Sequence, residues 1–64
     1  MTIDLKLISD TGNISYRMNF DTVASAVTYG EDNAYEFEVL ATYYDSEQDK
    51  EVTKVVYECN NPLT

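Results

Sequence analysis

The sequence predicts a single α+β domain, in which two β-hairpins form a small four-stranded antiparallel sheet and one short helix lies between the hairpins. Three observations carry this prediction. Apolar and polar residues alternate twice near the N-terminus, a helix-type spacing follows, and the alternation returns in the second half of the chain. A chain of 64 residues has room for one hydrophobic core, so residues 1–64 are expected to form one domain.

The first hairpin is predicted from two alternating runs, 3–8 and 14–20, which flank a turn that contains Gly12. Glycine suits this turn because it adopts a positive φ without steric cost. Alternation places the apolar side chains of both runs on the inner face of the hairpin: Ile3, Leu5, Leu7, Ile14, Tyr16, Met18 and Phe20. Arg17 is then expected to point outward.

A helix of about two turns is predicted over residues 22–29. The apolar residues between positions 23 and 27 have helical spacing, Asp21 is a suitable N-cap, and Gly30 is a suitable C-terminal stop. Threonine and valine are mediocre helix formers, so a strand over the same residues is the alternative.

The second hairpin is predicted from residues 34–44 and 52–59, which flank the polar connection 45–50. In the first run, alternate residues are expected to face the core: Tyr35, Phe37, Val39, Ala41 and Tyr43. In the second run, one face is expected to carry Thr53, Val55, Tyr57 and Cys59.

Charge limits the function of this protein. Twelve acidic and four basic side chains give a net charge of -8, and there is no histidine. A surface this negative repels nucleic acid and anionic membranes, and it attracts positively charged protein surfaces. Without histidine, the usual general base near neutral pH is missing. We therefore expect no enzymatic activity, no catalytic residues and no cofactor.

A metal site is not expected either. Asp45, Glu47 and Asp49 have the spacing of the first ligands of an EF-hand loop. Lys50, however, stands where the sharp turn of that loop needs glycine, and Val56 stands where it needs a bidentate glutamate. The segment is typical of a solvated hairpin loop.

Cytoplasmic localisation is expected. Asp4 and Lys6 interrupt the N-terminal segment, which therefore does not resemble a signal peptide. The lone Cys59 cannot form an internal disulfide, which favours a reducing compartment. A core this small gains stability from self-association, so a homodimer is compatible with the sequence.

The candidate partner-binding residues come from the second half of the chain, which holds -7 of the net charge of -8. Acids two residues apart lie on the same side of a strand, about 6.5–7 Å from each other. Exposed tyrosine and leucine beside such acids would supply apolar anchors. The candidate residues are Glu31, Asp32, Glu36, Glu38, Leu40, Tyr44, Asp45, Glu47 and Asp49.

In size, acidity and predicted β-rich architecture, the chain resembles, as a class, the small acidic phage-encoded inhibitors of host nucleic-acid enzymes, such as anti-CRISPR proteins, anti-restriction proteins and inhibitors of uracil-DNA glycosylase. The resemblance implies that the protein binds the nucleic-acid groove of a host nuclease or CRISPR effector by DNA mimicry, in the cytoplasm of the host cell. Two alternatives stay open. The protein is a non-inhibitory interaction module that uses a sheet face or edge, or its acids serve solubility.

Overall fold

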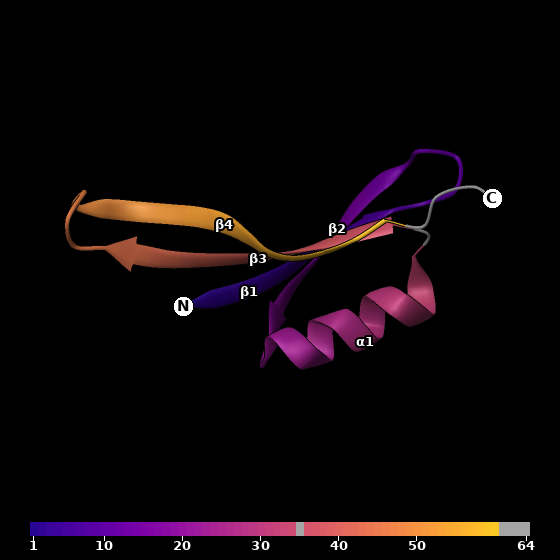
Figure 1. Ribbon diagram of the computed structural model, residues 1–64, viewed down its shortest axis with the longest axis horizontal. Helices are drawn as coiled ribbons and strands as arrows, with labels where there is room; N and C mark the ends of the chain where they lie inside the picture. Colours follow the sequence, from indigo (N-terminus) through magenta and orange to yellow (C-terminus); the bar gives the residue numbers. More distant parts are fainter. Residues whose placement is uncertain (35, 61–64) are drawn as a thin grey trace.

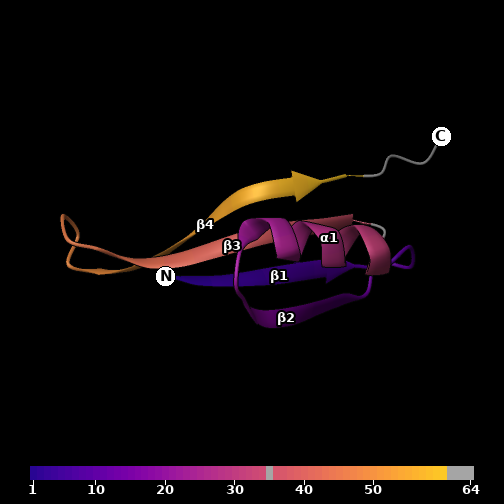
Figure 2. The same cartoon turned by 90° about the horizontal axis from the view of Figure 1, so that it is seen from below.

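The chain forms a four-stranded antiparallel sheet with one helix on one of its faces, as predicted (Figure 1, Figure 2). The computed structural model describes residues 1–34 and 36–60. The elements are β1 (Thr2–Ile8), β2 (Ile14–Phe20), α1 (Val23–Asn33), β3 (Glu36–Asp45) and β4 (Lys50–Cys59). The sheet order is β2-β1-β3-β4, so the two hairpins join through the antiparallel pairing of β1 with β3.

The core lies between the two central strands and α1. Alternate residues of β1 and β3 are buried beneath the helix, as predicted: Ile3, Leu5, Leu7, Phe37, Val39 and Ala41. Burying one leucine or phenylalanine side chain contributes about 1.5–3 kcal/mol. The core therefore depends on a few large side chains. Tyr35, also predicted to face inward, lies outside the described residues.

The helix begins and ends later than predicted. Thr22 is the N-cap, rather than Asp21: its hydroxyl accepts from the Ser25 N–H at 3.0 Å, and the Ser25 hydroxyl accepts from the Thr22 N–H at 3.3 Å. This reciprocal pair is a capping box, built with serine in place of glutamate. Gly30 does not stop the helix, which continues to Asn33. The segment therefore forms a helix, Val23–Asn33, and not the alternative strand.

Gly30 is needed for packing rather than for a turn. It lies in the helix directly over the ring of Phe37, and a Cβ at this position would come within 2.6 Å of two ring atoms. Phe37 is itself 1% exposed and stacks on Tyr57, with 5.9 Å between the ring centroids. Glycine thus lets α1 approach the sheet closely.

A β-bulge changes the face that β2 presents. Ile3 pairs with Phe20 but Leu5 pairs with Arg17, so β2 has one extra residue at this point. Asn19 is the neighbour of Phe20 and has a φ of 63°, a conformation that asparagine tolerates better than most residues. Its N–H donates to Asp4 Oδ1 at 3.1 Å, which fixes the bulge.

The inward face predicted for β2 is therefore wrong for three of its four residues. Arg17 lies on the helix side, with its guanidinium 5.0 Å from the centroid of the Tyr29 ring. Phe20 is on that side as well, 5.7 Å from the same ring. The residues displaced to the opposite face are more than half exposed: Ile14 (55%), Tyr16 (57%) and Met18 (62%).

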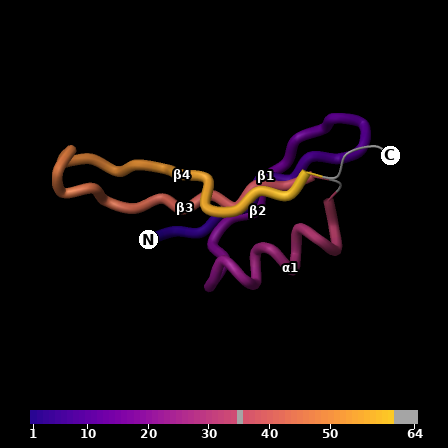
Figure 3. Tube along the Cα trace, viewed as in Figure 1, coloured from indigo at the N-terminus to yellow at the C-terminus, as the bar shows by residue number. Residues whose placement is uncertain are grey.

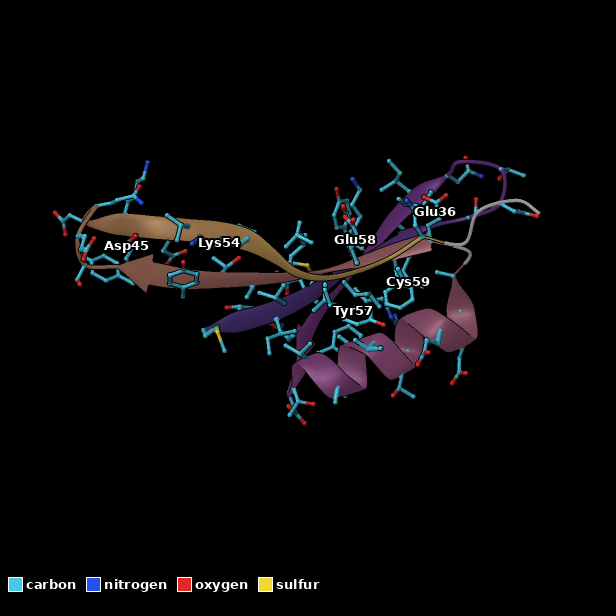
Figure 4. All side chains as sticks on the ribbon, in the orientation of Figure 1. Glu36, Asp45, Lys54, Tyr57, Glu58 and Cys59 are labelled. Carbon is cyan, nitrogen blue, oxygen red and sulfur yellow. The ribbon has the colours of Figure 1, made fainter. Side chains whose placement is uncertain are left out.

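A second bulge divides β4. Val39 pairs with Tyr57, whereas the next residue, Leu40, pairs with Val55, so Val56 is the extra residue. The trace of β4 has a sharp step in its middle (Figure 3). The predicted common face of Thr53, Val55, Tyr57 and Cys59 is therefore wrong. Tyr57 and Cys59 point toward α1 (Figure 4). Thr53 and Val55, which precede the bulge, lie on the opposite face of the sheet.

The second hairpin is longer than the rest of the sheet. β1 pairs with β3 as far as Thr42, and beyond this residue β3 pairs with β4 alone. We call residues 43–52 the arm; it projects past the helix and the first hairpin (Figure 2). The molecule is consequently elongated, with extents of 43 × 20 × 17 Å.

Replacing Gly30 with alanine tests the close contact between the layers. Alanine gains about 1 kcal/mol of helix propensity over glycine. The overlap with the buried Phe37 ring should cost more, because overpacking typically costs about 1–3 kcal/mol. We expect Gly30→Ala to lower the free energy of unfolding by up to about 2 kcal/mol in urea denaturation. Ala24→Ser, on the exposed side of α1, is the control and should change it by less than about 0.5 kcal/mol. A stabilised Gly30→Ala variant would contradict this packing.

Candidate functional site

The sheet face opposite α1 is not covered by another layer of the described chain, and we call it the open face. On the central strands it presents Asp4, Lys6, Ile8, Glu36, Glu38, Leu40 and Thr42. On the outer strands it presents Ile14, Tyr16, Met18, Thr53, Val55 and Glu58. The face is therefore apolar along β2 and acidic toward β3 and β4.

Three carboxylates gather on the open face; we call Glu36, Glu38 and Glu58 the acidic cluster. Glu36 and Glu38 are two residues apart on β3, and Glu58 is the register partner of Glu38 on β4. Glu36 and Glu58 lie on the same side of the sheet in Figure 4. Like charges directly opposite each other destabilise a strand pair. A cation that approaches the open face would therefore reduce the repulsion within the acidic cluster.

Lys6 partly neutralises the acidic cluster. Its Nζ lies 3.6 Å from Oε1 of Glu38, and both side chains are 28% exposed. A partly exposed pair of this kind contributes about 0–1 kcal/mol, so a partner's cation could compete for Glu38. Glu36 has a neutral partner: the amide nitrogen of Asn60, turned toward it, donates to its two oxygens at 3.0 and 3.3 Å. Within the part of the chain that the structure describes, neither Glu36 nor Glu58 lies in an ion pair.

The other predicted acids lie elsewhere. Glu31 and Asp32 are exposed near the end of α1, in the helical layer, where Asp32 lines an open depression with residues of the first turn. Asp45, Glu47 and Asp49 lie at the tip of the arm, and Figure 4 places Asp45 and Glu36 at opposite ends of the second hairpin. The seven candidate acids therefore form three groups.

Leu40 and Tyr44, the predicted apolar anchors, follow the acids along β3. Leu40 is half-buried beside Val55, and Tyr44 is 60% exposed on the arm. Both alternate in register with Glu36 and Glu38, so they extend the open face toward the tip of the arm.

The acids at the tip of the arm build the turn. Asp45 Oδ1 accepts from the Glu47 N–H at 2.9 Å, and Asp45 Oδ2 accepts from the Gln48 side-chain amide at 3.1 Å. Asp49 adopts a φ of 55° and accepts a hydrogen bond from the Tyr44 hydroxyl. These carboxylates are used by local bonds, which agrees with a hairpin loop.

Sequence reasoning missed the apolar part of the open face. Strict alternation puts Ile14, Tyr16 and Met18 on the side of Phe20 and therefore predicts them in the core. Asparagine at position 19 was the available signal, since it tolerates the positive φ of a bulge. The open face therefore offers more apolar contact area than the sequence predicted.

Comparison with known proteins does not assign the chain to a family. No protein-family model, curated protein or solved structure matches the chain. Within residues 1–34 and 36–60, no group of three or more His, Cys, Asp or Glu side chains could hold a metal ion. The same residues include no helix with the length and apolar character needed to cross a membrane.

The bond between Tyr44 and Asp49 predicts an altered titration. The hydrogen bond to the carboxylate, with a smaller contribution from lost hydration, raises the pKa of Tyr44 above its usual value of 10.0. The folded-state pKa then exceeds the unfolded one, so this bond stabilises the fold below pH 10 and the effect is lost as pH rises through the folded-state pKa. We expect Asp49→Asn to lower the Tyr44 pKa, because the variant removes the charge next to the phenolate.

This titration can be followed by NMR of the tyrosine Cζ carbons, with Tyr44→Phe to assign the signal. Glu47→Gln is the control: it removes a carboxylate from the same turn but leaves the Tyr44 bond intact. An equal fall in pKa for both variants would mean that the general charge of the arm, rather than the bond, causes the shift.

Proposed function

We propose that the protein is a small acidic inhibitor that binds the basic nucleic-acid groove of a host enzyme, such as a nuclease or a CRISPR effector, in the host cytoplasm. It acts by binding, without catalysis. The observation that carries this proposal is the acidic cluster on the open face, where Glu38 and Glu58 oppose each other across β3 and β4. Arginine or lysine from a groove would relieve this repulsion and form charge-assisted hydrogen bonds.

The geometry of the cluster supports mimicry of a phosphate backbone. Residues two apart on one strand are separated by about 6.5–7 Å, and neighbouring strands by about 4.8 Å. Successive phosphates of one DNA strand are separated by 3.4 Å along the helix axis, so the charges of a phosphate backbone also lie several ångströms apart. Glu36, Glu38 and Glu58 therefore present charges at a density that a basic groove accepts, on a sheet rather than a flexible chain.

The two other acidic groups have a different role in this proposal. Glu31 and Asp32 lie in the helical layer, and the carboxylates of Asp45 and Asp49 are used in the turn at the tip of the arm. They add to the long-range field that speeds association with a basic partner, while the open face makes the contacts that slow release. Leu40 and Tyr44 would then provide apolar contact next to the acidic cluster.

A double charge reversal tests the role of the acidic cluster. Glu36→Lys with Glu38→Lys should weaken capture of nucleic-acid-binding proteins from a bacterial lysate by more than about tenfold, or about 1.4 kcal/mol. Capture is measured at low and high salt by quantitative mass spectrometry. A captured enzyme is then tested for loss of binding to a labelled DNA duplex when the wild-type protein is added.

Glu31→Lys with Asp32→Lys is the matched control, because it makes the same change in net charge in the helical layer. It should slow association but leave most of the affinity. Equal losses for the two variants would mean that net charge alone drives binding, and the open face would then have no special role.

The alternative is a non-inhibitory interaction module, which the exposed apolar side chains of the open face support. Such a module should bind its partner at high salt and without competition from the DNA duplex. Loss of that binding on Tyr44→Ala, with retention after the double charge reversal, would favour the module over the inhibitor.

A further inference from the structure

We infer that β2 is a homodimer edge, at which two copies of the chain pair their β2 strands antiparallel around Tyr16. β2 is an outer strand of the sheet, and three of its side chains on the open face are more than half exposed: Ile14, Tyr16 and Met18. An edge strand presents unpaired backbone groups that can template another strand. The inference is independent of the proposed inhibition.

The first turn fixes which backbone groups of β2 point outward. The Ser9 N–H donates to the Asn13 carbonyl at 2.9 Å and the Asn13 N–H donates to the Ser9 hydroxyl at 3.1 Å, so the backbone groups of these two residues face each other, as in a hydrogen-bonded pair. Bonded and non-bonded pairs alternate along an antiparallel ladder. The next pair, Ile8 with Ile14, is then non-bonded, and so is Lys6 with Tyr16. The N–H and C=O groups of Ile14 and Tyr16 consequently point away from β1, toward the free edge.

The strand is self-complementary about Tyr16. In an antiparallel pair centred on this residue, Tyr16 lies opposite Tyr16 of the second copy and exchanges two backbone hydrogen bonds with it. Ile14 then lies opposite Met18, so every pair on the open face is apolar or aromatic. On the other face Ser15 lies opposite Arg17, which avoids a pair of like charges.

The distribution of charge also favours a second copy of the chain as the partner of this edge. Each chain carries -8, and repulsion would oppose most orientations of two copies. β2 is free of carboxylates and includes Arg17, so two copies meet there with the least repulsion. The opposite edge, β4, carries charges of both signs, including two carboxylates, which oppose edge pairing.

The mass of the 64-residue chain in solution tests this inference. Sedimentation or light scattering over a wide range of concentrations should give a species of twice the 7.3 kDa chain mass. Tyr16→Asp places two carboxylates opposite each other on the two-fold axis and should raise the dimer dissociation constant by about tenfold or more. Val56→Asp, at the other edge, should leave it unchanged. A wild-type chain that is monomeric at every concentration would overturn the inference.

Disulfide formation provides a second readout that does not depend on the stability of a charged variant. Residues that form a hydrogen-bonded antiparallel pair have Cα atoms about 5.5 Å apart, within reach of a disulfide. In a Cys59→Ser background, Tyr16→Cys should therefore form covalent dimers on mild oxidation much faster than Val56→Cys. Equal rates for the two would place the interface elsewhere and refute the β2 edge.

Discussion

The contact between the Phe37 ring and the backbone of Gly30 joins the two layers of this small protein. The ring fills the space that a side chain at position 30 would take, and Tyr57 stacks against it from β4. The helix therefore rests on the sheet near the start of β3, directly after the chain leaves α1. The core has few large side chains, so the helix covers only a part of one face of the sheet. The position of the helix therefore also determines which parts of the sheet remain uncovered. The open face and the arm follow from this single-sided packing.

The two bulges determine what the uncovered parts of the sheet present. Both occur in outer strands, where the extra residue disturbs the pairing with one neighbour only. At Asn19 the bulge moves Arg17 to the helix side of the sheet, next to Tyr29, and turns Tyr16 and its apolar neighbours to the open face. At Val56 it keeps Tyr57 against the core while Val55 joins the open face. Without these bulges, the apolar residues of β2 would share the face of the core.

The sequence predicts the two faces of a strand correctly where the alternation is uninterrupted and the strand pairs with a neighbour on each side. β1 and β3 are such strands, and their buried and exposed faces were predicted correctly as far as Thr42, whereas Tyr43, which was predicted to face the core, lies in the arm beyond it. In β2 and β4, one inserted residue reverses every side chain beyond it, and local alternation gives no indication of where the insertion lies. The prediction that Gly30 ends the helix is wrong for a related reason. A glycine required by a contact with Phe37, a residue of another element, resembles a glycine that ends a helix.

The same sheet thus separates an acidic surface from an apolar edge. The acidic cluster lies on β3 and β4, whereas the proposed dimer edge lies on β2, with β1 between them. A dimer through β2 would leave both acidic clusters exposed on one continuous face, so dimerisation and the binding of a basic partner are compatible. Salt acts on the two interfaces in opposite directions, because it screens the repulsion between copies and weakens the attraction to a cationic groove. This opposition follows from where the charges lie in the sheet, since β2, which is free of carboxylates, is an outer strand, whereas the acidic cluster lies on β3 and β4.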